Sequence, residues 1–410
     1  MNLYIFSENT YGSIYGIGTY VRELVCALSG RLSSITVIHL YNEGEHIMMK
    51  DKQGIRYWDF PAPIVAYRAM DNKDLRRLYF RNIAYLLRLH IRERKDIVFH
   101  LNYHHNMDLV NELRSSFDCR IIAVAHYSEW GFSIFDNPIR LRCLLNSKVL
   151  DEFSEGVLKQ FEEERMDYEK ADYLICLSHY MAILVNNIYG IDMDRIIVIP
   201  NGLTDSKQTV NLDPISLRRK WHLEKNEKII LFVGRIDEVK GIYFLIESFR
   251  KVLESFHDCR LILVGSGQYD ELVFRCAGFT STRIILTGLI ERQNIYELYR
   301  LADVGVVPSL FEPFGYVPVE MMMHGLPIVA TATSGLNEVV DESCGRKVPL
   351  SVSTDEVTID TDLLAEQIVY LLRHPEEARR LGQNGRRRYL SEYTSERFGQ
   401  RMLAFYESLN

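Results

Sequence analysis

The sequence predicts a protein of two doubly wound α/β domains, and three observations lead to this fold class. The chain has 410 residues, more than one ordinary hydrophobic core holds, which suggests two domains of about 200 residues each. Short apolar, β-branched runs alternate with amphipathic segments, which favours parallel sheets covered by helices on both faces. Proline, glycine, asparagine, serine and aspartate cluster in "IPNGLTDSKQTVNLDP", residues 199–214, and this composition marks the joint between the domains.

The expected strands form two series, one on each side of this joint. They are "LYIFS", "ITVIHLY", "DIVFHLNY", "RIIAVAH", "YLICLS" and "RIIVIP" before it, and "KIILFVG", "RLILVG", "RIILTG", "VGVVPS" and "PIVATA" after it. Amphipathic stretches such as 18–32 and 75–94 are the expected covering helices. The last residues, 391–410, predict a helix with one apolar stripe made of Phe398, Met402, Phe405 and Leu409.

Composition narrows the class of protein. The apolar fraction of 47% and the charged fraction of 25% are those of a globular chain. A net charge of −7 does not favour nucleic-acid binding, which needs a basic face. The seven cysteines are scattered without a C-x-x-C pair, which indicates reduced thiols rather than disulfides or a zinc site. We find no secretory signal pattern and no apolar run of about 20 residues, so we expect a cytoplasmic location.

The first motif is "LFVGRIDEVKG", residues 231–241, at the end of an expected strand. Gly234 ends the strand, Arg235 and Lys240 follow, and Gly241 precedes an amphipathic helix. A glycine lets the backbone approach a ligand, and a helix N-terminus attracts anions. Two cations five residues apart can flank a diphosphate. The alternative is a tight turn with two solvated cations.

The second motif is "LVGSGQYDEL", residues 263–272. Gly265 and Gly267 follow a strand, as in dinucleotide-binding turns. Asp270 stands where the third glycine of that pattern would be, and its charge would repel a pyrophosphate. From these residues alone, a plain strand-to-helix turn is the simpler interpretation.

The third motif, "FEPFGYVPVEMMMHG", residues 311–325, places two carboxylates among apolar residues. The amides of Phe314, Gly315 and Tyr316 are expected to form a helix N-terminus. Glu312 from the loop and Glu320 from the helix can then reach one ligand at that end. Ionised carboxylates only accept hydrogen bonds, so we expect donors such as sugar hydroxyls. The alternative is that Glu320 pairs with a buried arginine or lysine.

Together these segments resemble the retaining glycosyltransferases of family 4. The resemblance covers "GRIDEVKG", "LVGSGQ", "TGLI" and "IYELYRLADVGVVPSLFEPFGYVPVEMMMHGLPIVATATSGLNEVV". Glu312 and Glu320, with seven residues between them, fit the family's most diagnostic motif. "IPNGL" fits its interdomain hinge, and "YEKADYLICLSHYM" resembles the segment that often precedes that hinge. The likeness covers the second half densely and the first half thinly.

The resemblance implies the GT-B fold, two Rossmann-like domains facing a central cleft. Residues 1–202, completed by a helix over about 392–410, would bind the acceptor, and 203–391 would bind the nucleotide sugar. Hexosyl or N-acetylhexosaminyl transfer from a UDP- or GDP-sugar, with retention, is implied. The acceptor would be a glycan, a lipid-linked group, a protein or a small molecule.

The resemblance also implies roles for residues of the three motifs. Arg235 and Lys240 would neutralise the donor diphosphate, so that no metal and no other cofactor is expected. Glu320 would accept from the ribose hydroxyls, and Glu312 from hydroxyls of the transferred sugar. Backbone close to the donor would come from Gly234, Gly265, Gly267, Phe314, Gly315, Tyr316 and Val317.

The first half offers fewer candidates. "SENTYGSIYGIGTYVREL", residues 7–24, predicts a glycine-bearing loop that enters a helix. Gly16 and Gly18 would approach the donor phosphates and the acceptor, although similar proteins have two adjacent glycines there; an ordinary flexible loop is the alternative. His126 follows a strand, where the resemblance implies contact with the sugar or the acceptor, against a structural role. His104 and His105 lie at a similar strand end, but their spacing fits no metal-ligand template.

Residues 68–95 carry nine basic and three acidic side chains. A basic amphipathic helix can lie on an anionic membrane, which would suit a lipid-linked acceptor. A helix with a solvated cationic face is the alternative. The expected apolar stripe consists of Leu75, Leu78, Tyr79, Ile83, Leu86, Leu87 and His90.

Two rival functions follow from the same motifs. A GT-B nucleotide-sugar 2-epimerase would need the diphosphate clamp but no acceptor, and a non-catalytic sensor would bind the donor without turnover. An oxidoreductase is disfavoured because neither domain opens with a complete G-x-G-x-x-G.

Overall fold

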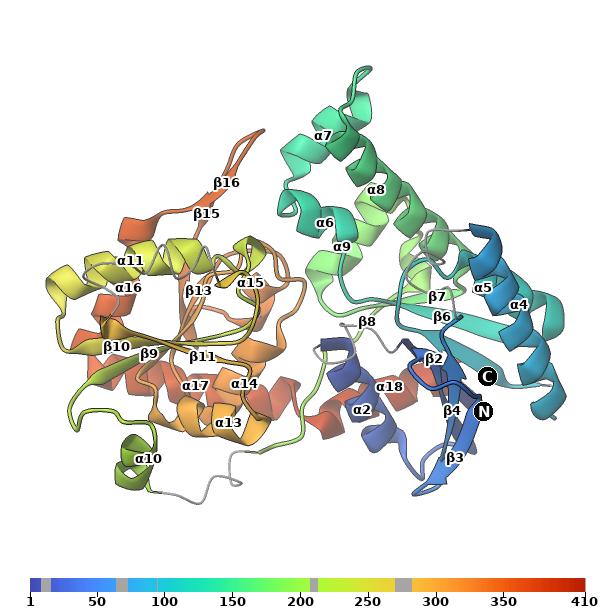
Figure 1. The fold of residues 1–410 in the computed structure, drawn as a ribbon, viewed down its shortest axis with the longest axis horizontal. Helices are drawn as coiled ribbons and strands as arrows, with labels where there is room; N and C mark the ends of the chain where they lie inside the picture. Colours follow the sequence, from blue (N-terminus) through green and yellow to red (C-terminus); the bar gives the residue numbers. More distant parts are fainter. Residues whose placement is uncertain (9–15, 64–72, 94, 207–212, 270–281, 410) are drawn as a thin grey trace. The chain divides into compact units, whose positions relative to one another are not determined.

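The computed structural model describes residues 1–8, 16–63, 73–93, 95–206, 213–269 and 282–409 (Figure 1). The chain forms two compact units: unit 1 comprises Met1–Glu129, Glu155–Gly202 and Ser395–Asn410, and unit 2 comprises Trp130–Ser154 and Leu203–Thr394. The division after Gly202 falls inside the joint expected at 199–214, of which 207–212 lie outside the described residues. Segment 130–154 groups with unit 2, whereas the sequence suggested that it belongs to the first domain.

Unit 1 contains an eight-stranded sheet in the order β3-β4-β2-β1-β5-β6-β7-β8. All neighbouring strands are parallel except β3 and β4. The strands that follow β1 in the sequence are added first on one side of it (β2 to β4) and then on the other (β5 to β8). The switch point therefore lies between β1 and β5, where ligands of such sheets bind. The strands are β1 (Asn2–Glu8), β2 (Ser34–Asn42), β3 (Met48–Lys52), β4 (Ile55–Pro61), β5 (Ile97–Leu101), β6 (Cys119–Ala125), β7 (Tyr173–Cys176) and β8 (Ile196–Val198).

The helices of unit 1 follow the expected alternation with the strands. Gly190, in the left-handed conformation, ends α9, as is usual for a helix C-terminus. They are α2 (Gly16–Leu28), α4 (Lys73–His90), α5 (Met107–Ser116), α8 (Glu152–Lys170), whose first turn belongs to unit 2, α9 (His179–Tyr189), the short η1 (Met193–Arg195) and α18 (Ser395–Glu407).

The final helix α18 completes the core of unit 1. The predicted stripe of Phe398, Met402, Phe405 and Leu409 is buried, which confirms that interpretation. The His100 imidazole of β5 lies between the Tyr20 hydroxyl of α2, at 3.2 Å, and the Tyr406 hydroxyl of α18, at 2.8 Å. Residues from three distant parts of the sequence therefore share one buried polar contact. Burial lowers the pKa of His100 to about 3, so it is neutral at pH 7.

Unit 2 contains a six-stranded parallel sheet in the order β11-β10-β9-β12-β13-β14. Numbered along this unit the order is 3-2-1-4-5-6, that of a Rossmann fold, and its switch point lies between β9 and β12. The strands are β9 (Lys228–Val233), β10 (Cys259–Val264), β11 (Ile284–Gly288), β12 (Val304–Val307), β13 (Ile328–Thr331) and β14 (Gly345–Val348), and a separate hairpin is formed by β15 (Leu350–Val352) and β16 (Val357–Ile359).

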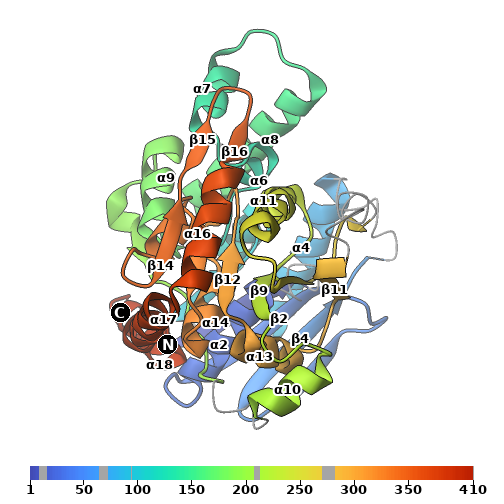
Figure 2. The same ribbon diagram turned by 90° about the vertical axis from the view of Figure 1, so that its left-hand side faces the viewer.

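Helices cover both faces of this sheet (Figures 1 and 2). Apolar side chains of α11 and α16 share one core with inward residues of β9, β10 and β12, and α14 packs with α17 and α13. The helices of unit 2 as a whole, not all of which cover the sheet, are α6 (Glu129–Ile134, beginning at the last residue of unit 1), α7 (Pro138–Asn146), α10 (Pro214–Lys220), η3 (Glu238–Lys240), α11 (Ile242–Ser255), α13 (Arg292–Leu301), α14 (Tyr316–His324), α15 (Leu336–Val339), α16 (Thr361–Arg373) and α17 (Pro375–Glu392).

Two sequence expectations about unit 1 need correction. Gly16 and Gly18 lie in the first turn of α2 rather than in a loop, and residues 9–15 before them lie outside the described residues. In α4 the buried residues are Phe80, Ile83, Ala84, Leu87 and neighbouring Ile91, whereas Leu78 and His90 are exposed. Residues 64–72 and 94, part of the basic segment 68–95, lie outside the described residues. Within the described part of the chain, no helix is long and apolar enough to span a membrane.

Candidate functional site

The candidate site of unit 2 is built from two loops that flank the switch point of its sheet. Residues 234–241 follow β9, and residues 308–315 follow β12. The loops are joined by a hydrogen bond from the Leu310 amide to the Val239 carbonyl, at 2.8 Å. Gly241 adopts a φ of +65°, and a Cβ at this residue would lie 1.8 Å from the Pro308 carbonyl oxygen. Glycine is therefore required at 241 for the two loops to meet.

Lys240 and Glu312 come together between these loops. The Lys240 ammonium lies 2.5 Å from the Glu312 carboxylate, and both side chains are largely buried. The carboxylate of Asp237 accepts from the Lys240 amide at 3.0 Å and so caps η3, an arrangement that holds the turn carrying Lys240. The sequence interpretation assigned Lys240 and Glu312 to different parts of a donor, and the structure shows that they form one ion pair.

Arg235 lies on the same loop and is partly exposed. Its guanidinium pairs with Asp237 at 2.9 Å and lies over the ring of Phe132, with 5.4 Å from the Cζ atom to the ring centroid. Phe132 in turn packs edge-on against Phe311, next to Glu312. Segment 130–154 therefore supplies the aromatic ring on which Arg235 lies. Local sequence patterns did not reveal this contact. Asp237 was detectable, because an aspartate three residues before Lys240 is a capping signal.

The loop that carries Glu312 is held from its other side by residues that follow β13. The Thr333 hydroxyl donates to the Leu310 carbonyl at 2.8 Å, and the Leu336 amide donates to the Glu312 carbonyl at 3.1 Å. Helix α14 begins at Tyr316 after Gly315, so the amides of residues 314–316 lie at its N-terminus, as expected. An anion at this end would face backbone N–H groups and the positive end of the helix dipole.

Glu320 is buried in the middle of α14 and has two partners on α13. One carboxylate oxygen lies 2.8 Å from the Arg292 guanidinium, and the other accepts from the Tyr299 hydroxyl at 2.9 Å. The alternative considered from the sequence, pairing with a cation, is thus what the structure shows. Because each carboxylate oxygen can accept more than one hydrogen bond, this pairing leaves acceptor capacity for a further donor. Arg292 and Tyr299 lie seven residues apart on one helix face, a pattern that has meaning only once α13 is seen to pack on α14.

The glycines of "LVGSGQ" are explained by backbone packing. A Cβ on Gly265 would lie 1.7 Å from the Gly234 carbonyl oxygen, and one on Gly267 would lie 2.1 Å from the Ile236 carbonyl oxygen. The Ile236 amide donates to the Ser266 carbonyl at 2.8 Å. The turn after β10 therefore packs against the backbone of the loop that carries Arg235.

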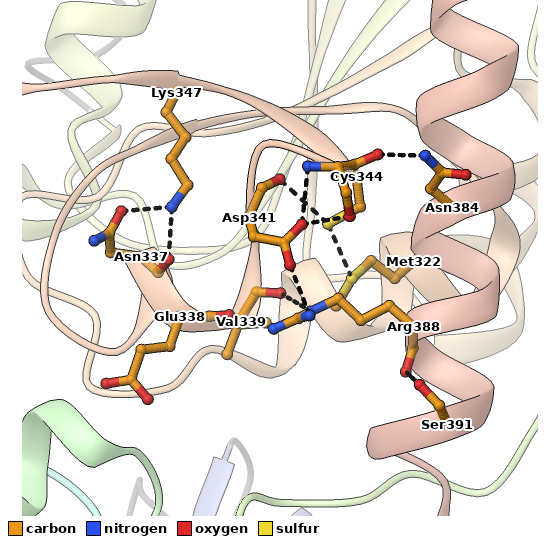
Figure 3. A network of polar contacts seen from close by, with 11 residues as sticks. Met322, Asn337, Glu338, Val339, Asp341, Cys344, Lys347, Asn384, Arg388 and Ser391 are labelled. Atoms are coloured by element: carbon orange, nitrogen blue, oxygen red, sulfur yellow. Dashed lines mark hydrogen bonds and ion pairs between the residues drawn. The ribbon is translucent and has the colours of Figure 1, made fainter.

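A network around Arg388 anchors the end of α15 to α17 (Figure 3). The Arg388 guanidinium donates to the carbonyls of Glu338 and Val339, at 2.7 and 3.0 Å, and pairs with Asp341 at 2.7 Å. The Asn384 amide of the same helix donates to the Ser343 carbonyl at 2.6 Å. These contacts fix the segment after β13 that supports Glu312.

In unit 1, His126 lies at the carboxyl end of β6, beside the switch point. Its Nε2 lies 3.0 Å from the Asn102 side-chain oxygen Oδ1, and the Asn102 side-chain Nδ2 donates to the Phe6 backbone carbonyl at 2.9 Å. Its ring meets that of Tyr20 edge-on at 4.7 Å. Burial, with nearby His100 and His104, holds the pKa of His126 well below its usual value. Because Nε2 of the neutral ring donates to the Asn102 Oδ1, Nδ1 is left as the acceptor for a hydrogen bond from a ligand.

His104 and His105 differ sharply. Burial lowers the pKa of His104 to about 4. His105 lies between two carboxylates, 3.1 Å from Glu129 and 3.4 Å from Glu163, and the hydrogen bond to Glu129 raises its pKa. Burial also raises the pKa of nearby Glu8 to about 8. The sequence analysis singled out both histidines but not these acids, which come from three separate segments.

Comparison with known proteins agrees with this geometry. The model of "Glycosyl transferases group 1" matches residues 215–388, and that of "Glycosyltransferase Family 4" matches residues 14–207. An uncharacterized glycosyltransferase of Methanocaldococcus jannaschii is 33% identical over 174 residues, 41% of this chain and 44% of the relative. The D-inositol 3-phosphate glycosyltransferase of Xylanimonas cellulosilytica is 30% identical over 183 residues, 42% of this chain and 43% of the relative. The matches thus span less than half of these two curated relatives.

Solved structures resemble the whole chain. Sucrose-phosphate synthase of Thermosynechococcus elongatus superposes with a TM-score of 0.78 at 23% identity, covering 100% of this chain and 98% of that one. HepE of Anabaena, solved with UDP and glucose, superposes with a TM-score of 0.73 at 16% identity, covering 99% of each chain. The fold and the site define a protein of two Rossmann-like units, one of which has basic and acidic side chains on the loops at the switch point of its sheet. The chain belongs to the glycosyltransferases of group 1, within family 4, and has the GT-B fold.

Proposed function

We propose that this protein transfers a sugar from a nucleotide-diphosphate sugar to an acceptor hydroxyl, with retention of the anomeric configuration. One observation carries the proposal. The two loops at the switch point of the unit 2 sheet bring together Arg235, Lys240, Glu312 and the start of α14, with Glu320 one turn further. Cations and a helix N-terminus suit a diphosphate, and carboxylates suit sugar hydroxyls.

The proposed reaction exchanges one bond for another. The acceptor hydroxyl oxygen bonds to the anomeric carbon, the bond from that carbon to the diphosphate oxygen breaks, and the hydroxyl proton leaves with the diphosphate. Negative charge develops on the departing diphosphate, where Lys240, Arg235 and the amides of α14 stabilise it. Glu312 holds the Lys240 ammonium in place and accepts from hydroxyls of the moving sugar. Neutral His126 would orient the sugar or the acceptor.

The donor class has support from relatives. HepE was solved in complex with UDP and glucose, and another relative is named N-acetyl-alpha-D-glucosaminyl L-malate synthase. We therefore propose a UDP- or GDP-linked hexose or N-acetylhexosamine as the donor. The two cations take the part that a divalent metal plays in other diphosphate sites, so turnover should survive EDTA. Loss of activity in EDTA that magnesium or manganese restores would overturn this assignment.

A panel of nucleotide sugars tests the proposal directly. The donor should raise the thermal midpoint by mass action, and the same compound should then yield a glycosylated acceptor. Lys240→Ala should lower kcat/KM by an amount that corresponds to roughly 2–4 kcal/mol of lost transition-state stabilisation. This is the effect of removing one hydrogen-bond donor from an oxyanion hole. Lys225→Ala, at an exposed position of the same unit, is the control and should be unaffected. Conversion of the donor into its 2-epimer without any acceptor would establish the rival activity instead.

Helix α4 has a surface suited to an anionic membrane, and we propose that it contacts one. Leu78, Tyr85 and Leu89 are exposed hydrophobic residues at spacings of seven and four, which places them on one helix face. Exposed Arg81 and Arg88 lie next to them along the helix. Apolar side chains flanked by arginines can insert among headgroups while the cations attract acidic lipids.

A further inference from the structure

Unit 1 contains a cavity between α2 and the edge of its sheet. The cavity has a volume of about 860 Å³, within the range of about 300–1,000 Å³ that is usual for ligand pockets. One wall is a single face of α2, formed by residues spaced three and four apart. The other is the open face of β2, β4 and β3. The α2 residues are Gly18, Val21, Arg22, Val25, Cys26 and Ser29.

The register of the strands explains why polar side chains gather on the second wall. Ser7 of β1 pairs with His39 of β2, and His39 pairs with Asp59 of β4. In the same way Lys52 of β3 pairs with Ile55 of β4. Paired residues point to the same face of a sheet. Ser7, His39 and Asp59 line the cavity near the carboxyl ends of β1, β2 and β4, the edge at which α/β sheets bind ligands, and Lys52 and Ile55 line it at the amino end of β4.

The charges on the lining leave the cavity positive. Asp59 is already engaged, because the His39 imidazole lies 2.7 Å and the Lys50 ammonium 3.3 Å from its carboxylate. Burial raises the pKa of Glu8 to about 8, so this carboxyl of the lining is largely protonated at pH 7. Within the described chain, no carboxylate lies at ion-pair distance from Lys52. Arg22 is more than half exposed, and its guanidinium lies 3.8 Å from the Glu23 carboxylate.

From this geometry we propose that the cavity binds the anionic group of a sugar-sized acceptor, with Arg22 and Lys52 holding a phosphate or carboxylate. Lys50, His39 and Asp59 form an ion-paired cluster on the strand wall of the cavity. Ser7 and Asn42 offer further hydrogen-bonding groups. The apolar side chains Val21, Val25 and Ile55 suit the carbon face of a sugar ring. The identification of the ligand as the acceptor rests on the proposed transfer reaction, whereas the anion-binding cavity stands on its own residues.

Three probes test the proposal: glucose 6-phosphate, glucuronate and glucose. We expect the two anionic compounds to bind in isothermal titration, and glucose to bind at least tenfold more weakly. The double variant Arg22→Gln/Lys52→Gln should weaken anion binding at least tenfold, since charge-assisted hydrogen bonds are the strong ones. Arg31→Gln/Lys159→Gln removes the same charge from exposed positions of unit 1 and should bind like the parent. Because all four positions are exposed or lie on a cavity wall, we expect both proteins to fold, and circular dichroism checks this.

Two results would overturn the proposal. One is that neither anionic probe binds more tightly than glucose, and the other is that both double variants lose anion binding equally. Nucleotide binding by unit 2 is measured on the same proteins, so failure of the cavity is distinguishable from failure of the transferase assignment. Donor binding that persists in the Arg22/Lys52 variant, together with a raised KM for an anionic acceptor, supports the acceptor role. A changed kcat with no product formed on any anionic compound would instead establish a regulatory anion site and refute the acceptor role.

Discussion

Glu320→Gln separates a role in donor binding from a role in holding two helices together. In the structure the carboxylate is shared between the Arg292 guanidinium and the Tyr299 hydroxyl, at 2.8 and 2.9 Å. Glutamine keeps the shape of the side chain, but it replaces an anionic acceptor with one neutral oxygen and one amide donor. Both the helix contact and any bond to the ribose of the donor should weaken. The experiment therefore needs a partner variant that disturbs only the helix contact.

Tyr299→Phe is that partner. It removes one hydrogen bond to the carboxylate and leaves the charge and the Arg292 pair in place. A hydrogen bond to a charged group contributes about 1.5–3 kcal/mol, so each variant should lose stability of this order in urea unfolding. If Glu320 accepts from the ribose hydroxyls, Glu320→Gln should also lose about 1.5–3 kcal/mol of binding free energy. This corresponds to roughly 10- to 150-fold in Kd.

The assay is calorimetric titration of both variants with the nucleoside diphosphate that the donor panel identifies. We expect the affinity of Tyr299→Phe to stay within about twofold of the parent, because this variant keeps the Glu320 carboxylate and its pair with Arg292. Equal weakening in both variants would refute the reasoning, since it would assign the effect to the packing of α13 on α14. Unchanged affinity in Glu320→Gln would do the same and leave the residue as a purely structural ion pair.

Four further predictions concern Glu312, Gly241, Glu164 and helix α4. Glu312→Gln, whose amide oxygen can still accept from the Lys240 ammonium, should slow transfer by more than it weakens nucleotide affinity, and equal loss of both in parallel assays would contradict the separate roles of the two acids. Gly241→Ala should destabilise unit 2 by more than the about 1–2 kcal/mol of a left-handed alanine, because its Cβ meets the Pro308 carbonyl. Gly288→Ala, with φ +68° and only an ordinary contact of its Cβ with the Tyr269 hydroxyl at 3.9 Å, should show only the backbone strain in urea unfolding. Burial raises the pKa of Glu164 in the folded protein to about 8, so folding favours the protonated carboxyl. The stability that this group contributes is complete below about pH 4.5 and is lost as the pH rises to about 8. Glu164→Gln, which resembles the protonated acid, should flatten this decline of up to about 1.4 kcal/mol per pH unit, and an unchanged slope of urea midpoint against pH would oppose it. Changing exposed Arg77, Arg81 and Arg88 of α4 to glutamine should reduce cosedimentation with anionic liposomes at low salt, whereas changing Arg379, Arg380 and Arg387 of α17 should not; equal loss, or no binding by the parent, would favour a solvated face.

The sequence predicted the central strands of both sheets well, for a physical reason. Strands such as β9 and β12 are covered on both faces, so they consist of nearly uninterrupted apolar residues. The strands it missed are β3, β4, β14 and the hairpin of β15 and β16; β3 and β14 lie at sheet edges, and β4 lies between β3 and β2. β3 is exposed throughout its length, and its "MMKDK" contains no buried pattern to detect. The hairpin of β15 and β16 is equally short, and its residues gain their strand conformation only by pairing with each other.

The candidate site was only partly predictable. Local motifs revealed Arg235, Lys240 and Glu312 because they follow strands, and Glu320 because it is an acid among apolar residues. Their pairings could not be read from those motifs, since the Lys240–Glu312 pair joins residues 72 positions apart. The stacking of Phe132 on Arg235 depends on segment 130–154 belonging to unit 2, and local periodicity contains no information about such a distant contact.

The way α18 closes unit 1 has a consequence for the order of events during synthesis. The core around Tyr20 and His100 needs Phe398 and Tyr406, which are translated only after the segment Leu203–Thr394 of unit 2. At about 5–20 residues per second, the first unit waits on the order of 10–40 seconds for its last helix. During that time an apolar groove beside α2 lacks its cover and is open to chaperones or to other nascent chains. A circular permutant that begins with α18 would remove the wait, and the two termini, both in unit 1, lie near each other in Figures 1 and 2.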